Sequence, residues 1–333
     1  MISIDVGTKK VCVVEGSVHS GNVTLTGWGE IAYDSDVFEE GVLIDPTTLS
    51  FLISEIIKRN RMKSKNAVIT VTNNNVIMRE LILPEMKPKE MQTIVANEMQ
   101  RLIGSDNKLT VDYIVVEKMS DKTNKVMAYA MNSDNVEIYQ KLLKGLKLTP
   151  TALDIHSNAI AKLFGKTTIN NMPHGEDSIV VADIGYAQIS FHGFLNGIKH
   201  FDRTEISPVS DFLNEIASIT RMEISQEMIN SLDFTMDHIY ENSMMADTCR
   251  FFISRLSDEI QRYLQYMISN STIKSIRKIY LMGSLVETTG LVNTIAGSLG
   301  IEVELLSSIG KLQLPADCPA YKVANAAGAL IRY

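Results

Sequence analysis

The chain has 333 residues, enough for two or three domains, and its 45% hydrophobic and 21% charged residues are typical of a globular protein. Its net charge of -7 argues against general nucleic-acid binding, which needs a basic surface. The three cysteines lie far apart without disulfide or zinc spacing, and no stretch reaches the roughly 18 apolar residues of a membrane helix. With no signal-peptide pattern at the start, these features predict a cytoplasmic protein that reaches the inner face of the cell membrane only through a partner.

The first 72 residues predict the order strand, strand, strand, helix, strand. Residues 2–6 and 11–15 are apolar and flank a turn that contains Asp5 and Gly7. Pro46 begins a stretch with helical spacing of apolar residues, and residues 67–71 read as a buried strand. This order is the basic unit of an actin-like half.

Residues 76–147 predict a separate subdomain of the type βαββα. The expected elements are a strand at 76–83, a helix at 89–102, strands at 109–119 and 126–131, and a helix at 134–146. Because this segment interrupts the larger pattern, we expect it to carry partner binding rather than to support the scaffold.

The remaining chain predicts a second half that opens like the first. A strand at 148–154 and a helix at 155–164 precede a loop at 165–177, the expected domain boundary. A second hairpin follows, with Asp183 and Gly185 in its turn. The later predicted elements are two helices within 203–245, a long amphipathic helix at 244–270, a strand at 279–284, a helix at 290–299, a strand at 301–306 and a small-residue helix at 320–332 that packs against 155–164.

The predicted domains follow from this order. The first lobe comprises residues 1–75, 148–172 and 316–333, and the inserted subdomain comprises 76–147. The second lobe comprises 176–315, with a helical subdomain at about 204–245.

Both hairpin turns have the residues that phosphate binding requires. Gly7-Thr8 and Gly185 would let backbone N–H groups face an anion, and Asp5 and Asp183 could hold a divalent metal directly or through water. Lys9 or Lys10 could add a positive charge. A third strand end, Gly283-Ser284-Leu285, would let a base or ribose approach the backbone. One such turn is commonly an ordinary hairpin, but two of them with the third element predict a nucleotide cleft.

Other chemistries have no motif in this chain. The six histidines show no H-E-x-x-H spacing, and neither a G-x-S-x-G elbow nor a G-x-x-x-x-G-K-[ST] loop occurs.

The arrangement resembles the actin, sugar-kinase and chaperone-ATPase superfamily, and within it the PilM family of type IV pilus assembly proteins. Residues 81–86 (LILPEM) with Glu90, Ile94 and Glu98 resemble the start of that family's inserted domain. Residues 258–266 (DEIQRYLQY) and the helix at 324–332 are similar to its later motifs. The resemblance implies an α/β, actin-like (ribonuclease H-like) two-lobed fold with an inserted βαββα subdomain of the FtsA and PilM type.

The resemblance also implies a function. The protein would be a scaffold that binds the cytoplasmic tail of a PilN-like inner-membrane protein near Leu81, Leu83 and Pro84, with pilus assembly ATPases or further copies of itself as other partners. ATP with Mg would occupy the cleft between the lobes, the metal being held by Asp5 and Asp183. The implied nucleotide-binding residues are Asp5, Gly7, Thr8, Lys9, Lys10, Asp183, Gly185, Tyr186, Ala187, Gln188, Gly283, Ser284 and Leu285.

The chain departs from the family pattern around this cleft. Lys9 and Lys10 stand where the family has small hydroxyl residues, and Tyr186 and Gln188 stand where it has a small residue and a threonine. Ser207-Pro208 replaces a glycine pair, and the glycine pair of the adenosine turn is Gly283-Ser284, with Leu285 after it. These changes predict weak nucleotide binding and slow or lost hydrolysis. The alternatives are an active ATPase or phosphotransferase that uses Asp5, Asp183 or Gln188, and a filament-forming protein like FtsA.

Overall fold

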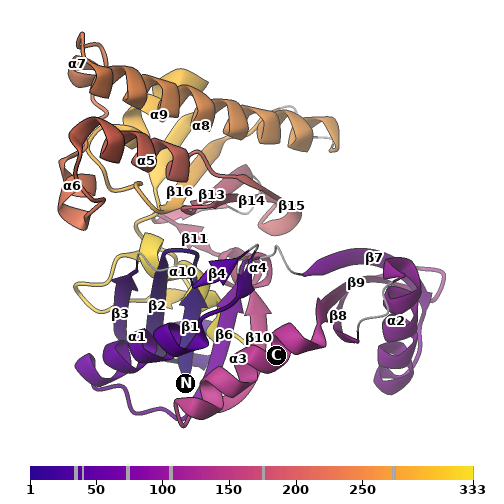
Figure 1. Cartoon of the computed structure of the whole chain (residues 1–333). Coiled ribbons are helices and arrows are strands. Elements are labelled where there is room, and N and C mark those ends of the chain that lie inside the picture. Colours follow the sequence, from indigo (N-terminus) through magenta and orange to yellow (C-terminus); the bar gives the residue numbers. More distant parts are fainter. Residues whose placement is uncertain are drawn as a thin grey trace.

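The computed structural model describes residues 1–33, 37–39, 41–72, 76–104, 108–174, 177–271, 273 and 275–332. The chain forms two lobes, one above the other in Figure 1, and a smaller subdomain that projects from the side of the first lobe. Two ends of the predicted domains, Asn75 and Tyr333, lie outside the described residues, as do residues 175–176 of the predicted boundary loop.

The first lobe is built on a six-stranded sheet with the order β10-β6-β1-β2-β3-β18. β1 is antiparallel to β2 and parallel to β6, which is parallel to β10. The order predicted for the first 72 residues is confirmed, although the structure adds a ribbon of two short strands, β4 and β5, before the helix. The strands are β1 (Ile2–Val6), β2 (Lys10–His19), β3 (Asn22–Ala32), β4 (Phe38–Glu39), β5 (Val42–Leu43), β6 (Asn66–Val71), β10 (Thr149–Ile155) and β18 (Leu312–Gln313).

Helices α1 (Pro46–Arg59) and α3 (Ser133–Gly145) cover the outer face of this sheet. α1 begins where the Asp45 carboxylate accepts hydrogen bonds from the first free backbone N–H groups, those of residues 47 and 48. α3 packs Tyr139, Leu142 and Leu143 into the first-lobe core, although its sequence position places it in the predicted inserted subdomain. α3 therefore ties the inserted segment to the first lobe.

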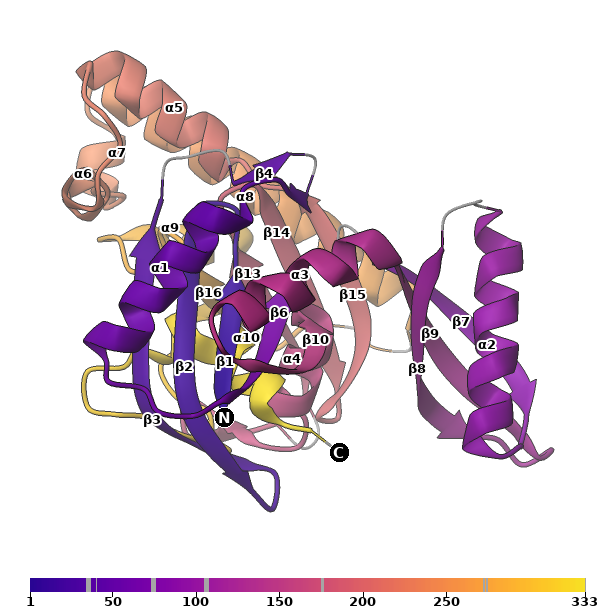
Figure 2. The same cartoon turned by 60° about the horizontal axis from the view of Figure 1, so that its bottom comes forward.

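The rest of the inserted subdomain forms its own core. Its strands follow the order β7-β9-β8, and α2 covers one face of the sheet through Met91, Val95 and Met99. Figure 2 shows α2 on the outer side, so the other face of the sheet is turned toward the lobes. The elements are β7 (Ile77–Pro84), α2 (Pro88–Ile103), β8 (Leu109–Lys118) and β9 (Thr123–Asn132), as the sequence predicts.

The second lobe repeats the strand pattern of the first. Its sheet has the order β15-β14-β13-β16-β17, with β13 antiparallel to β14 and parallel to β16. The strands are β13 (Ser178–Ile184), β14 (Gln188–Leu195), β15 (Ile198–Ile206), β16 (Lys278–Gly283) and β17 (Glu302–Leu305), and the helices are α5 (Val209–Thr220), α6 (Gln226–Ser231), α7 (Met236–Ile239), α8 (Met244–Ser269) and α9 (Leu291–Leu299).

Two details of this half differ from the sequence-based prediction. The helical subdomain expected at about 204–245 begins only at Val209, because β15 extends to Ile206, and it contains three helices in place of two. The predicted boundary loop at 165–177 contains a short hairpin, β11 (Thr168–Ile169) and β12 (Met172–Pro173). Both differences involve segments too short or too polar for a clear apolar period. In addition, β18 falls within the predicted second lobe (176–315) but pairs with β3 in the first-lobe sheet, so the chain returns to the first lobe before residue 316.

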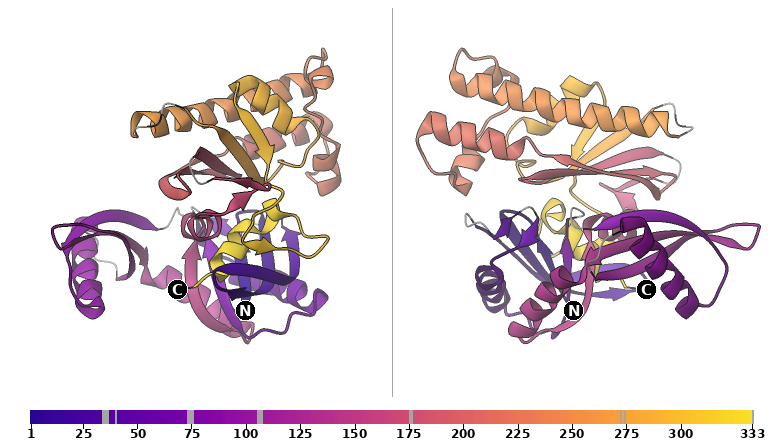
Figure 3. Two further views of the ribbon diagram at one scale, coloured as in Figure 1. Left: turned by 180° about the vertical axis from the view of Figure 1, so that it is seen from behind. Right: turned by 45° about the vertical axis from the view of Figure 1, so that its right-hand side comes forward.

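Helices α4 (His156–Phe164) and α10 (Ala320–Leu330) lie between the two sheets. Apolar residues of both sheets and of both helices form one buried cluster there, while α5, α8 and α9 cover the far face of the second sheet. Figure 3 shows the same layers from two further sides. Among the described residues, no helix combines the length and the apolar character needed to cross a membrane.

The contact between α4 and α10 depends on a glycine. An added Cβ on Gly328 would lie 2.2 Å from the Ala159 carbonyl oxygen and 2.6 Å from its carbon. The predicted packing of the closing helix against residues 155–164 is thus confirmed, and it needs a residue without a side chain at this position.

We expect Gly328→Ala to lower the free energy of unfolding by about 1–3 kcal/mol, because the backbone of α4 cannot move away without disturbing both sheets. Urea unfolding measures the change. Gly297→Ala in α9 is the matched control: its Cβ would meet no atom within 4 Å, so it should be neutral or stabilising by about 0.4–1 kcal/mol. Equal losses in both variants would contradict this account of the helix contact.

Candidate functional site

The two predicted turns have the same geometry. The Gly7 N–H donates to the Lys10 carbonyl at 2.9 Å, and the Gly185 N–H donates to the Gln188 carbonyl at 2.8 Å. A Cβ on Gly185 would lie only 2.6 Å from that carbonyl oxygen, so this turn excludes a side chain. Because β1 and β13 hold equivalent positions in their sheets, the turns face each other across the space between the lobes.

A cavity of about 540 Å³ lies between these turns. This volume is within the range of pockets that bind small molecules. All thirteen residues that the sequence predicts for nucleotide binding, from Asp5 to Leu285, line this cavity. The lining also includes residues of α5, of α6 and of the loop between these helices: Val209, Leu213, Ala217, Glu223, Ile224, Ser225, Gln226 and Ile229.

Two carboxylates at the base of the cavity each accept a hydrogen bond from a buried side chain. His156 Nε2 lies 2.7 Å from Asp5 Oδ1, and Asn325 Nδ2 donates to Asp183 Oδ2 at 2.7 Å. His156 Nδ1 lies 3.8 Å from Asp183 Oδ2, so the imidazole ring stands between the lobes' carboxylates. Burial lowers the pKa of His156, but the charge and hydrogen bond of Asp5, with the charges of Asp183 and Asp154, raise it above its ordinary value.

The lysines at the cavity also have partners. Lys10 Nζ lies 3.0 Å from Glu30, whose carboxylate outweighs the effect of burial and raises the pKa of Lys10. Lys322 of α10 contacts both Glu30 and Glu287, at 3.4 and 3.2 Å, and thereby joins the first lobe to the second. The cavity wall is therefore an ion-pair network.

Tyr186 and Leu285, two large residues of the predicted nucleotide-binding set, differ in how far they reach into the cavity. Lys9 Nζ lies 5.8 Å from the centroid of the Tyr186 ring, so this pair spans the cleft between the turns. Leu285 is 5% exposed and packs into the second-lobe core, although part of it reaches the cavity. Gly283 adopts a φ of +98°, and an added Cβ there would lie 2.5 Å from the Ile184 carbonyl. Of these residues, Tyr186 is the one that lies opposite Lys9 of the first turn.

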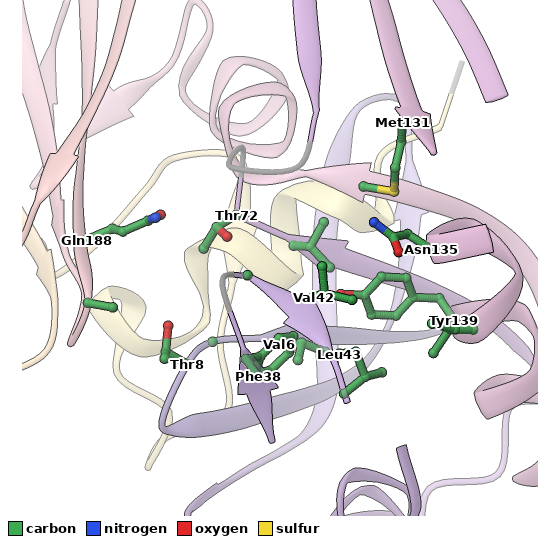
Figure 4. Close-up of a pocket in the computed structure, with 15 residues that line it drawn as sticks. Val6, Thr8, Phe38, Val42, Leu43, Thr72, Met131, Asn135, Tyr139 and Gln188 are labelled. Carbon is green, nitrogen blue, oxygen red and sulfur yellow. The ribbon is translucent and has the colours of Figure 1, made fainter. Parts of the chain in front are cut away.

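A second cavity, of about 410 Å³, lies beside the first (Figure 4). Figure 4 shows Asn135 and Tyr139 of α3 on one side and Thr8, Thr72 and Gln188 on the other. The β4–β5 ribbon contributes Phe38, Val42 and Leu43 to the lining, which also includes Val6, Val71, Met131 and Ile138. This second cavity is lined by both apolar and polar side chains.

The two cavities share part of their lining. Gly7, Thr8, Thr72, Ala187 and Gln188 line both. Within the described parts of the chain, Oε1 of Gln188 is buried and has no hydrogen-bond partner. A ligand in either cavity would therefore contact residues that the other ligand also touches.

The residues predicted for partner binding lie elsewhere. Leu81 and Leu83 pack against the core between the inserted sheet and α2, and Pro84 is exposed at the end of β7. None of the three lines either cavity. In the described ranges, no group of three or more His, Cys, Asp and Glu side chains is arranged to hold a metal ion.

Sequence analysis missed His156, Asn325 and the β4–β5 ribbon as site residues. A signal for His156 does exist: it directly follows β10, which is parallel to β6 and β1, and carboxyl ends of parallel strands meet at one edge of a sheet. Asn325 has no comparable signal, because its position depends on how α10 packs.

Comparisons with known proteins agree with this architecture. The family described as type IV pilus assembly protein PilM matches residues 3–331. The structure is similar to one described as a PilM–PilN type IV pilus biogenesis complex, with a TM-score of 0.78 and 20% identity over 99% of this chain and 97% of that one. It is also similar to the ethanolamine utilization protein EutJ from Carboxydothermus hydrogenoformans, with a TM-score of 0.56 and 13% identity over 99% and 88% of the two chains. No curated protein matches in sequence.

These likenesses confirm the predicted actin-like, two-lobed fold and the resemblance to the PilM family.

We expect Asn325→Ala to cost about 1–3 kcal/mol of unfolding free energy, since it leaves the buried Asp183 carboxylate without its donor. Thermal unfolding followed by circular dichroism measures the loss. The control, Asn230→Ala on the exposed side of α6, should change stability by less than about 0.5 kcal/mol. The assignment fails if the two variants unfold at the same temperature.

Proposed function

Since this chain belongs to the family of type IV pilus assembly proteins PilM, we propose that it is a cytoplasmic scaffold that binds the N-terminal tail of a PilN-like inner-membrane protein. The membrane association would come from that partner. The observation that carries the proposal is the second cavity, which lies between the first lobe and α3, the helix that ends the inserted segment.

The chemistry of this cavity suits an extended apolar peptide. Phe38, Val42, Met131 and Tyr139 offer apolar contacts for side chains, while Asn135 can donate to and accept from a peptide backbone. An inserted segment that supplies one wall gives the scaffold a binding site without altering the actin-like core. The tail would therefore bind at this cavity rather than at Leu81, Leu83 and Pro84. Leu81 and Leu83 pack against the core of the inserted subdomain, and Pro84 does not line the cavity.

The first cavity is proposed to bind ATP as a structural or switching ligand. The N–H groups of Gly7 and Gly185 are donated within the turns, so phosphates would be held by the other backbone N–H groups of these turns, while α5, α6 and the loop between them offer both apolar and polar side chains for an adenosine. Asp5 and Asp183, the predicted catalytic carboxylates, already accept hydrogen bonds from His156 and Asn325. This arrangement favours a scaffold over an enzyme that needs a free general base.

Phe38→Ala should weaken binding of a synthetic PilN-type tail tenfold or more, about 1.4 kcal/mol, because the ring supplies apolar area inside the cavity. Isothermal titration calorimetry with the full chain gives the affinity. Phe51→Ala, which removes a 68%-exposed ring from α1 away from the cavity, is the matched control and should bind like the unaltered chain. Equal affinity of both variants would contradict the assigned groove.

The shared wall predicts that the two ligands influence each other. Saturation with a non-hydrolysable ATP analogue should change tail affinity by about threefold or more, and the tail should change analogue affinity by the same factor. Fluorescence anisotropy measures both. Gln188→Ala should reduce this factor, because Gln188 lines both cavities. In a separate phosphate-release assay with ATP, the unaltered chain should show no hydrolysis above the rate in buffer. Independent binding of the two ligands would refute the coupling.

A further inference from the structure

The magnesium ion predicted between Asp5 and Asp183 can be tested against the atoms that are there. In a metal site, carboxylate oxygens face the ion or its bound waters. Here Asp5 Oδ1 faces His156 Nε2 at 2.7 Å, and Asp183 Oδ2 faces Asn325 Nδ2 at the same distance. The other oxygen, Asp183 Oδ1, lies so near Gly283 that a Cβ on that glycine would be 2.6 Å away.

The imidazole ring itself fills the space between the carboxylates. His156 is 5% exposed, and its second nitrogen, Nδ1, lies 3.8 Å from Asp183 Oδ2. The side chain comes from the first residue of α4, a helix held between both sheets, so the ring cannot easily move aside. Asp5 and Asp183 belong to different lobes, and the hydrogen bond between the ring and Asp5 offsets part of the cost of placing the two carboxylates near each other. The residues present therefore do not fit a divalent metal.

We propose that His156 occupies the place of a divalent cation between Asp5 and Asp183, so that the cleft binds its nucleotide as a metal-free anion. This inference rests on the nucleotide binding proposed above. The positive charge near the phosphates would come from Lys9 at the first turn, since Lys10 is paired with Glu30, together with backbone N–H groups of both turns other than those of Gly7 and Gly185.

The first test compares nucleotide binding with and without metal. A fluorescent ATP analogue should bind the full chain with the same affinity, within about twofold, in magnesium and in EDTA. Affinity that falls tenfold or more in EDTA would overturn the proposal.

The second test uses manganese without nucleotide. It therefore remains decisive if the first test finds that no nucleotide binds, a result that would count only against the proposed ATP site. Mn²⁺ titration followed by electron paramagnetic resonance should show no site that depends on Asp5, whereas His156→Asp, which places a third carboxylate there, should gain one. Asp5→Asn added to His156→Asp should remove the gained site. A manganese site in the unaltered chain that Asp5→Asn abolishes would overturn the proposal, whatever the fold of the His156 variant.

Discussion

Two carboxylates, one from each lobe, point into the same cleft, and the structure depends on the groups that offset their charge. The donors are His156 and Asn325, which come from α4 and α10. Both helices lie between the sheets, and their close approach requires the bare backbone of Gly328. Close helix packing thus fixes the donors, and the donors in turn offset the cost of placing the half-buried Asp5 beside the buried Asp183.

The sequence could predict the architecture because its signals are local. A carboxylate followed two residues later by glycine, between apolar strands, identifies each lobe's first hairpin, and all thirteen predicted nucleotide residues meet at one cavity. The inserted strands and α2 also follow from simple periodicity. The β4–β5 ribbon has only two residues per strand, too few to show alternation.

The features missed from the sequence are tertiary. The apolar face of α3 could pack on either the inserted sheet or the first lobe, and only the structure shows that it packs on the first lobe. The contact of Asn325 with Asp183 likewise depends on how α10 packs between the two sheets. His156 looked like an isolated histidine until the parallel pairing of β10 with β6 placed it beside Asp5. The same contacts between distant segments place His156 between Asp5 and Asp183, where the sequence predicted a metal ion.

The proposed scaffold has two adjoining cavities. The first cavity, with its paired carboxylates and ion-pair network, lies between the lobes, while the second lies between the first lobe, the turn at Gln188 and the helix α3. Thr8 and Gln188 line both, so the proposed nucleotide and the proposed partner tail would contact the same strand ends.

Hydrogen–deuterium exchange with a PilN-type tail tests the central claim most directly, because it locates a bound peptide along the whole chain. The account predicts protection at the β4–β5 ribbon and at the junction of β9 with α3. Protection confined to α2 and β7, or the absence of any protection at saturating peptide, would contradict it.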